Sequence, residues 1–242
     1  MFYPIKHITV TTPAGRKLPV WYVHSEAEHL DDPDGREEKV PGIAPGKERS
    51  CADLAEQAHE KGFKPEAERF AAQGERWKTL ADRTWPAVWA SLARALPIVH
   101  AYVVVPSRRQ ARVVAPRTAM WTAYPDAIEI VYSKAASART FGASERGEIV
   151  DALVRETTPM LPTPCKIAVL DDWLGRGETF DAMMERITSD FGGTSFDFVG
   201  AFPGVSQEFV PWSNRINDAV AHIVKMSNVP SPPQPGKAED GS

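Results

Sequence analysis

Apolar and β-branched residues near the start of the chain fall into two short segments, residues 5–10 and 18–24, separated by a turn-forming run, PAGR. Segments of strand length around such a turn predict a β-hairpin. Farther along, four continuous apolar runs predict the strands of a buried sheet. These runs are residues 98–105, 127–132, 166–170 and 196–202.

Segments with helical spacing precede the first of these four strands. Ser50 is a suitable N-cap for a helix over residues 50–61, and Pro65 suits the first turn of a second helix. A third helical segment is predicted over residues 85–96. Two or three helices are therefore expected before the sheet.

Another helix is predicted over residues 179–191, between the strands at 166–170 and 196–202. Its apolar side chains Phe180, Met183 and Ile187 fall on one helical face. Strand, helix and strand at this spacing are typical of a βαβ unit, whose two strands are parallel. The expected fold class is α/β, with a mainly parallel sheet and helices on both faces.

Changes in composition divide the chain into three regions. Residues 1–96 hold the hairpin, an acidic linker punctuated by Pro and Gly at 26–49, and the helical extension. Residues 97–227 hold the main α/β domain. Residues 228–242 are Pro-rich and polar, and we expect this tail to be disordered or extended.

The composition places the chain among globular proteins, with 43% hydrophobic and 25% charged residues in 242. A formal net charge of -4 provides no strong nucleic-acid signature, so any phosphate recognition must be local. Cys51 and Cys165 lack the spacing of a zinc site or a disulfide framework. With no secretory signal or membrane span in the sequence, a cytoplasmic protein is expected.

The candidate chemistry lies in residues 167–180, IAVLDDWLGRGETF, where a predicted buried strand ends in Asp171 and Asp172. Ligands of open α/β sheets bind at the carboxyl ends of strands. The glycines of the following loop let the main chain approach a ligand, and a helix N-terminus offers unpaired N–H donors for phosphate. Carboxylates can accept hydrogen bonds from ribose hydroxyls or share a magnesium ion with pyrophosphate. An ordinary turn with one N-capping acid is the simpler alternative, but it does not account for both acids.

This segment resembles the phosphoribosyl-diphosphate-binding loop of type I phosphoribosyltransferases, which usually reads DDxxTTGxT. Here the loop reads DDWLGRGET, so Gly175 and Arg176 replace the two central threonines. The resemblance implies a type I phosphoribosyltransferase-like fold. It also implies that Asp171 and Asp172 contact the ribose as catalytic residues and hold Mg²⁺. It further implies that the loop holds the 5′-phosphate through Gly175, Arg176, Gly177, Glu178 and Thr179.

Two upstream segments extend the resemblance. VVVPSRR, with Ser107, Arg108 and Arg109, lies where the family places its pyrophosphate loop, although a solvated turn explains these residues equally well. Residues 141–154, FGASERGEIVDALV, are similar to a Ser-x-x-Arg segment of ComF-like members, but the zinc-type cysteines of those proteins are missing.

Three functions follow from these observations. The first is a magnesium-dependent enzyme that transfers the phosphoribosyl group of phosphoribosyl diphosphate to an unidentified acceptor. The second is a non-catalytic regulator that binds phosphoribosyl diphosphate or a nucleoside monophosphate, and the third is an assembly protein that retains only the fold. The sequence leaves open whether the protein forms a homodimer, and it identifies no general base.

Overall fold

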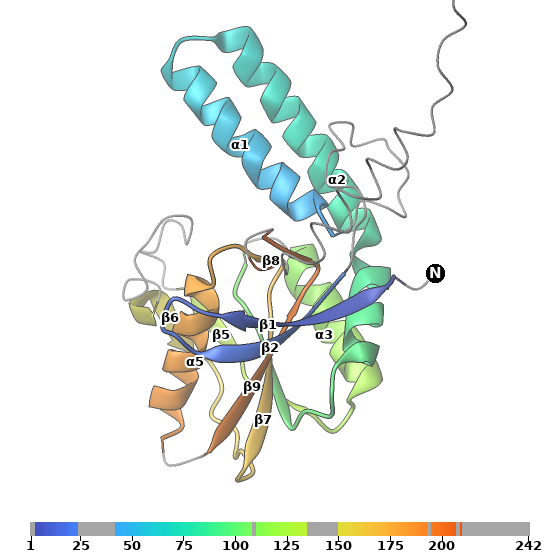
Figure 1. Cartoon of the computed structure of the whole chain (residues 1–242), viewed down its shortest axis with the longest axis vertical. Helices are drawn as coiled ribbons and strands as arrows, with labels where there is room; N and C mark the ends of the chain where they lie inside the picture. Colours follow the sequence, from blue (N-terminus) through green and yellow to red (C-terminus); the bar gives the residue numbers. More distant parts are fainter. Residues whose placement is uncertain are drawn as a thin grey trace, which may run out of the picture. The chain divides into compact units, whose positions relative to one another are not determined.

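The computed structural model describes residues 3–23, 42–107, 110–134, 150–192, 195–206 and 209, all within one compact unit, Met1–Phe209. Their centre is a six-stranded sheet with the strand order β1-β2-β9-β7-β3-β4 (Figure 1). The strands, in that order, are Ile5–Thr11, Lys17–Val23, Phe196–Phe202, Cys165–Leu170, Ala101–Val104 and Ile128–Glu129. The predicted tail at 228–242 and most of the predicted linker lie outside the described residues.

The predicted N-terminal hairpin is confirmed. β1 and β2 pair antiparallel, with Ile8 opposite Val20, and the Thr12 N–H donates to the Arg16 carbonyl at 3.0 Å to close the turn. β2 also pairs in parallel with β9, where Val20 lies opposite Gly200. The hairpin therefore supplies two of the strands of the main sheet.

The remaining pairs of the sheet, β9–β7, β7–β3 and β3–β4, are all parallel. β9 has the predicted bounds, whereas β3 is shorter than the predicted run because Ile98 precedes the sheet and is 80% exposed. The run at 127–132 is divided between β4 and β5 (Tyr132–Lys134). β5 pairs antiparallel with β6 (Leu153–Arg155) in a separate small sheet.

The first helix, α1 (Ala44–Glu60), begins before the predicted N-cap. Ile43 occupies the N-cap position and Pro45 lies in the first turn, which suits a residue without an N–H group. Ser50 is inside the helix, where its hydroxyl donates to the Gly46 carbonyl at 3.1 Å. The prediction of Ser50 as the N-cap was wrong, because a serine hydroxyl can also bond the preceding turn of a helix.

The second helix, α2 (Lys64–Ala95), is continuous where two helices were predicted, although Pro86 lies inside it. A proline within a helix costs about 3 kcal/mol. Burying a large apolar side chain contributes about 1.5–3 kcal/mol, and Trp85, Trp89 and Leu92 are all buried around the proline. Their combined burial outweighs the cost of Pro86, so the helix continues through it.

The third helix, α3 (Gln110–Ala123), was not predicted from the sequence. Its apolar residues are interrupted by arginine, threonine and an internal proline, Pro116, so no clear helical stripe is visible. Ala119 and Met120 are nevertheless buried in the core that α3 shares with α2. Tertiary packing, rather than local pattern, stabilises this helix.

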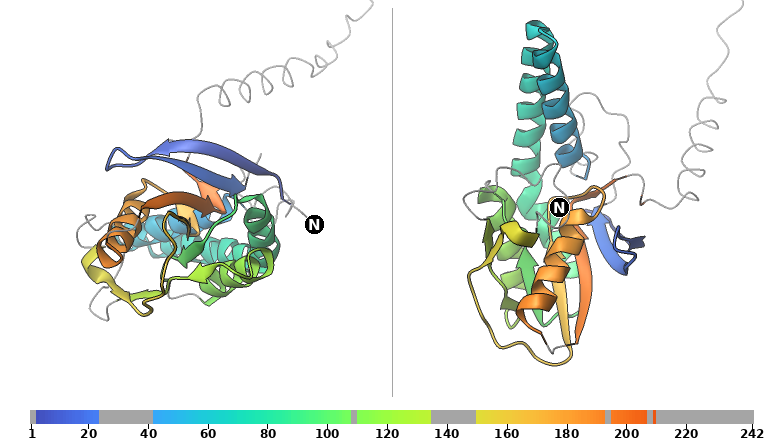
Figure 2. Two further views of the ribbon diagram at one scale, coloured as in Figure 1. Left: turned by 90° about the horizontal axis from the view of Figure 1, so that it is seen from below. Right: turned by 90° about the vertical axis from the view of Figure 1, so that its left-hand side faces the viewer.

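Two apolar cores lie on opposite faces of the sheet. Tyr102 and Ala168 belong to the core that includes α2 and α3, while Val103 and Val169 belong to the core that includes α5 (Glu178–Asp190). Figure 2 shows α5 and the α2–α3 pair on opposite sides of the central strands. The α/β class, the mainly parallel sheet and the β7–α5–β9 unit are therefore confirmed.

Candidate functional site

The two acids of the predicted loop directly follow β7, at the carboxyl edge of the parallel strands. The Asp171 N–H donates to the Ala201 carbonyl of β9 at 3.2 Å, and the Val105 N–H, just after β3, donates to the Leu170 carbonyl at 2.9 Å. The segments that follow β3 and β7 therefore meet at one edge.

Ser107 lies on the segment after β3 and is exposed. Arg108 and Arg109 lie outside the described residues, so their pyrophosphate contact stays a prediction.

Asp171 lies beside a second carboxylate, that of Asp172. Its Oδ1 atom accepts a hydrogen bond from the Asp172 N–H at 2.8 Å. Burial first, and the adjacent Asp172 carboxylate second, raise the pKa of Asp171 well above its usual value. The protonated form of Asp171 is therefore favoured, and it can donate as well as accept hydrogen bonds.

Asp172 is only 5% exposed and is bound by two arginines from different helices. Arg49 of α1 donates from Nη2 to Oδ1 at 3.0 Å, and Nη1 of Arg112, on α3, forms an ion pair with Oδ2. Arg112 also donates from Nη2 to Oε2 of Glu48 at 2.8 Å. The helices and the loop after β7 are thus joined through one charged network, formed by Glu48, Arg49, Arg112 and Asp172.

The sequence analysis did not identify the other three members of this charged network. Glu48 and Arg49 fall in the segment interpreted as a linker, and Arg112 lies three positions after Arg109 in a helix that was not predicted. The only signal was the third arginine of the run SRRQAR. A single sequence shows the charge of that residue but not its partner.

Trp173 packs against the start of α1 and is only partly exposed. Trp173 and Leu174 form a short strand, β8, which pairs in parallel with β10 (Gly204–Val205). A Cβ atom at Gly46 would lie 2.9 Å from the Trp173 ring, so a side chain there would collide with the indole. The indole therefore occupies space left by glycines beside the acids, and α1 covers this part of the carboxyl edge.

The loop from Gly175 to Thr179 ends at the first turn of α5. Gly177, the N-cap, has a left-handed φ of 92°, which favours glycine, and no side chain caps the helix. Among the described residues, no acceptor is recorded for the N–H groups of Glu178, Thr179 or Phe180. Arg176 is exposed and has no recorded side-chain partner there. This first turn has the free donors that an anion needs.

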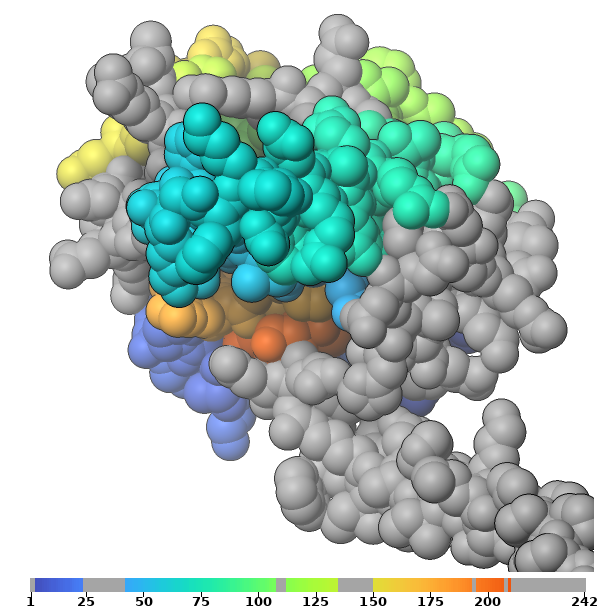
Figure 3. All heavy atoms as spheres, turned by 90° about the horizontal axis from the view of Figure 1, so that it is seen from above, coloured from blue at the N-terminus to red at the C-terminus, as the bar shows by residue number. Residues whose placement is uncertain are grey.

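Figure 3 views the protein from the end at which α1 and α2 project. Orange atoms from the segment that includes α5, and red-orange atoms from the segment that includes β10, reach the surface there. They lie between the cyan helices and the blue hairpin. Part of this edge is therefore accessible to a ligand beside the area that α1 covers.

The turn of the N-terminal hairpin borders the start of α5. Pro13 Cδ would lie 3.3 Å from a Cβ atom placed on Gly177, and the Ala14 N–H donates to Oδ2 of Asp181 at 2.9 Å. Asp181 is fully buried, and a carboxylate in the first turn of a helix is stabilised by the helix dipole. Asp181 therefore attaches the hairpin to α5.

Replacing Asp181 by alanine is expected to lower the free energy of unfolding by about 1–2 kcal/mol, because the Ala14 N–H loses its acceptor. Urea unfolding followed by circular dichroism measures this change. Asp197→Ala is the control, since its carboxylate is 62% exposed and pairs with Lys166 at the surface. Equal losses in the two variants would contradict the assigned role of Asp181.

As arranged, the acids do not offer the free carboxylates that a magnesium ion prefers. Asp172 faces two guanidinium groups, and burial and the adjacent Asp172 carboxylate raise the pKa of Asp171. In the described part of the chain, no group of three or more potential metal ligands is found. The predicted magnesium site at Asp171 and Asp172 therefore requires a different arrangement of Arg49 and Arg112.

No helix in the described ranges has both the length and the apolar character needed to cross a bilayer. No profile of a known protein family matches the chain, and no curated protein matches it significantly.

Solved structures similar to the chain include a xanthine-guanine-hypoxanthine phosphoribosyltransferase of Helicobacter pylori, at 13% identity and a TM-score of 0.32. This match covers 59% of the present chain and 95% of the other. They also include an adenine phosphoribosyltransferase, at 12% identity and a TM-score of 0.33, with 56% of this chain and 73% of the other covered. Similarity at this level does not by itself establish a family or an activity.

Proposed function

We propose that the chain binds a phosphorylated ribose at residues 171–179, and that with phosphoribosyl diphosphate it transfers the phosphoribosyl group to an acceptor. The observation that carries this proposal is the uncapped first turn of α5. It combines three N–H groups without a recorded acceptor with the exposed Arg176. A 5′-phosphate would accept hydrogen bonds from these N–H groups.

The acids beside this turn would bind the sugar. A protonated Asp171 both donates and accepts hydrogen bonds, and a carboxylate at Asp172 accepts them, so the pair suits the two hydroxyls of a ribose. Arg49 and Arg112 would place positive charge near a departing pyrophosphate, which stabilises the charge that develops during transfer. Magnesium stays a prediction. It would neutralise pyrophosphate charge, and Asp171 and Asp172 would hold it only after Arg49 and Arg112 had moved.

A non-catalytic regulator is the second candidate, and one observation favours it. Both oxygens of Asp172 are engaged by Arg49 and Arg112, and Trp173 packs against Gly46 of α1. The ribose would reach Asp172 only if α1 released it. A protein whose function is to couple ligand binding to a movement of α1 would not need to catalyse a reaction.

Calorimetry with phosphoribosyl diphosphate, with and without Mg²⁺, tests the binding site. We expect binding by the native chain, and at least about tenfold weaker binding by the double variant Asp171→Asn, Asp172→Asn, because the hydrogen bonds to the sugar are weakened. Asp197→Asn, with an exposed carboxylate elsewhere, is expected to bind as the native chain does. Circular dichroism would establish that all variants are folded.

Two further measurements separate the candidates. Pyrophosphate release across a panel of nucleobases and amines would support the transferase, whereas binding without release would support the regulator. Arg49→Gln is expected to tighten binding in the regulator, because it frees Oδ1 of Asp172, and to weaken binding in the transferase, because it removes a positive charge near pyrophosphate. No binding at millimolar ligand would contradict both candidates, and unchanged binding by the double variant would contradict the roles of the acids.

A further inference from the structure

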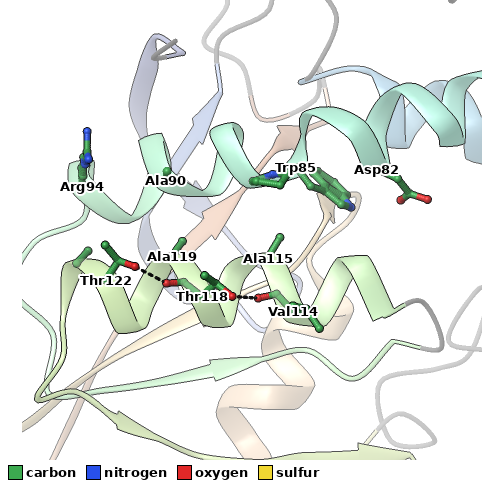
Figure 4. A pocket seen from close by; sticks show the side chains of 11 residues that line it. Asp82, Trp85, Ala90, Arg94, Val114, Ala115, Thr118, Ala119 and Thr122 are labelled. Atoms are coloured by element: carbon green, nitrogen blue, oxygen red, sulfur yellow. Dashed lines mark hydrogen bonds between the residues drawn. The ribbon is translucent and has the colours of Figure 1, made fainter.

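Helices α2 and α3 enclose a cavity of about 430 Å³ that has no residue in common with the loop at 171–179. Figure 4 shows α2 and α3 side by side, with Trp85 and Ala90 on one and Ala115 and Ala119 on the other. The cavity exists because alanines on both helices leave space that larger side chains would fill. Its volume falls within the range of sites that bind small molecules, about 300–1,000 Å³.

Polar groups without partners gather at one end of this largely apolar space. Oδ1 of Asp82 and Nε1 of Trp85 are both buried, and neither has a hydrogen-bond partner among the described residues. Pro86, one turn after Asp82, has no N–H to donate to the Asp82 carbonyl. Buried polar groups are nearly always paired in folded proteins, and an unpaired one costs about 1–3 kcal/mol. This end of the cavity is therefore suited to a polar group from outside the chain.

The charge of that group follows from the residues that line the cavity. Asp82 supplies a carboxylate with a buried oxygen, and its carbonyl is a second acceptor nearby. Arg94, the cation that lines the cavity, is twelve positions away along α2, or about 18 Å at the rise of an α-helix. A ligand cation can therefore reach Asp82 without approaching Arg94. An ammonium group carries three donors, which match the acceptors of Asp82, whereas the Nε1–H of Trp85 is itself a donor and does not pair with it.

We propose that this cavity binds a small organic amine. The ammonium group lies against Asp82, and an apolar body extends between Trp85 and the alanines of both helices. The hydroxyl of Thr118, in the middle of the cavity, donates to the Val114 carbonyl at 3.0 Å. The site is independent of the proposed phosphoribosyl site, and so is its test.

Calorimetry with the full chain tests this site, with 2-phenylethylamine as the probe and 2-phenylethanol as the neutral molecule of the same shape. We expect the amine to bind at least about tenfold more tightly than the alcohol, because only the amine forms a charge-assisted hydrogen bond with Asp82. Asp82→Asn should remove this preference. Asp53→Asn, on the exposed surface of α1, should keep it.

A second variant tests the cavity itself. Ala90→Phe fills the space between the helices and is expected to abolish binding of the amine while the chain stays folded by circular dichroism. The proposal would be overturned if the amine failed to bind at millimolar concentration, or if amine and alcohol bound equally. It would also be overturned if Asp82→Asn kept the preference for the amine. Dissociation of a dimer by Ala90→Phe, without amine binding by the native chain, would instead show that the cavity is a contact between copies.

Discussion

Replacing Arg112 by methionine is expected to lower the free energy of unfolding by about 3 kcal/mol, the lower end of the range for breaking a buried ion pair. Arg112 is 13% exposed and pairs with Glu48 and Asp172, which are 12% and 5% exposed. Without the guanidinium, these two carboxylates remain buried near each other. Methionine preserves much of the apolar stem of the side chain. The decrease in the free energy of unfolding therefore reports the removal of the charge and not of the packing.

Urea unfolding measures the effect of Arg112→Met. Arg49→Met is the matched control: its side chain is 50% exposed, and we expect a loss below about 1 kcal/mol. Equal losses in the two variants would contradict the role assigned to the charge of Arg112.

Replacing Gly204 by alanine is expected to lower the free energy of unfolding by about 2–3 kcal/mol, near the upper end of the usual cost of overpacking. A Cβ atom there would lie 2.0 Å from the Gly42 carbonyl oxygen and 2.5 Å from the Trp173 ring. The first contact is with main chain, which cannot move aside as a flexible side chain can. The start of α1, β8 and β10 would therefore have to separate.

Hydrogen exchange together with urea unfolding measures the response to Gly204→Ala. We expect faster exchange at the start of α1 and unchanged exchange in β7. Gly192→Ala is the control, since no atom lies within 4 Å of its Cβ position. A neutral effect of Gly204→Ala would mean that α1 does not pack on β8 and β10 in solution.

The elements predicted correctly are those specified by neighbouring residues. The hairpin follows from two apolar segments around a short turn, and the unit from β7 to β9 follows from two apolar runs around one amphipathic helix. Both signals are local, so a single sequence contains them. The acids after β7 were placed at the carboxyl edge for the same reason, because they directly follow the apolar run that forms the strand.

The elements that the sequence did not reveal depend on distant contacts. Ser50 was interpreted as a helix start, and residues 85–96 as a helix separate from the one that begins at Pro65. α1 instead begins earlier, and α2 continues through both segments because its apolar side chains are buried. The partners of Asp172 come from α1 and α3, and neither helix is near it in the sequence. Their charges could be read from the sequence, but their proximity could not.

The pairing of β2 with β9 affects the order in which the chain can fold during synthesis. Residues 5–23 leave the ribosome well before residues 196–202, yet Val20 pairs with Gly200 of the last strand of the main sheet to be made. Until then, one edge of the hairpin has no partner, and unpaired strand edges promote association between chains. Pairings this distant in sequence also form slowly. The nascent hairpin therefore has an unpaired strand edge that needs protection until synthesis reaches β9.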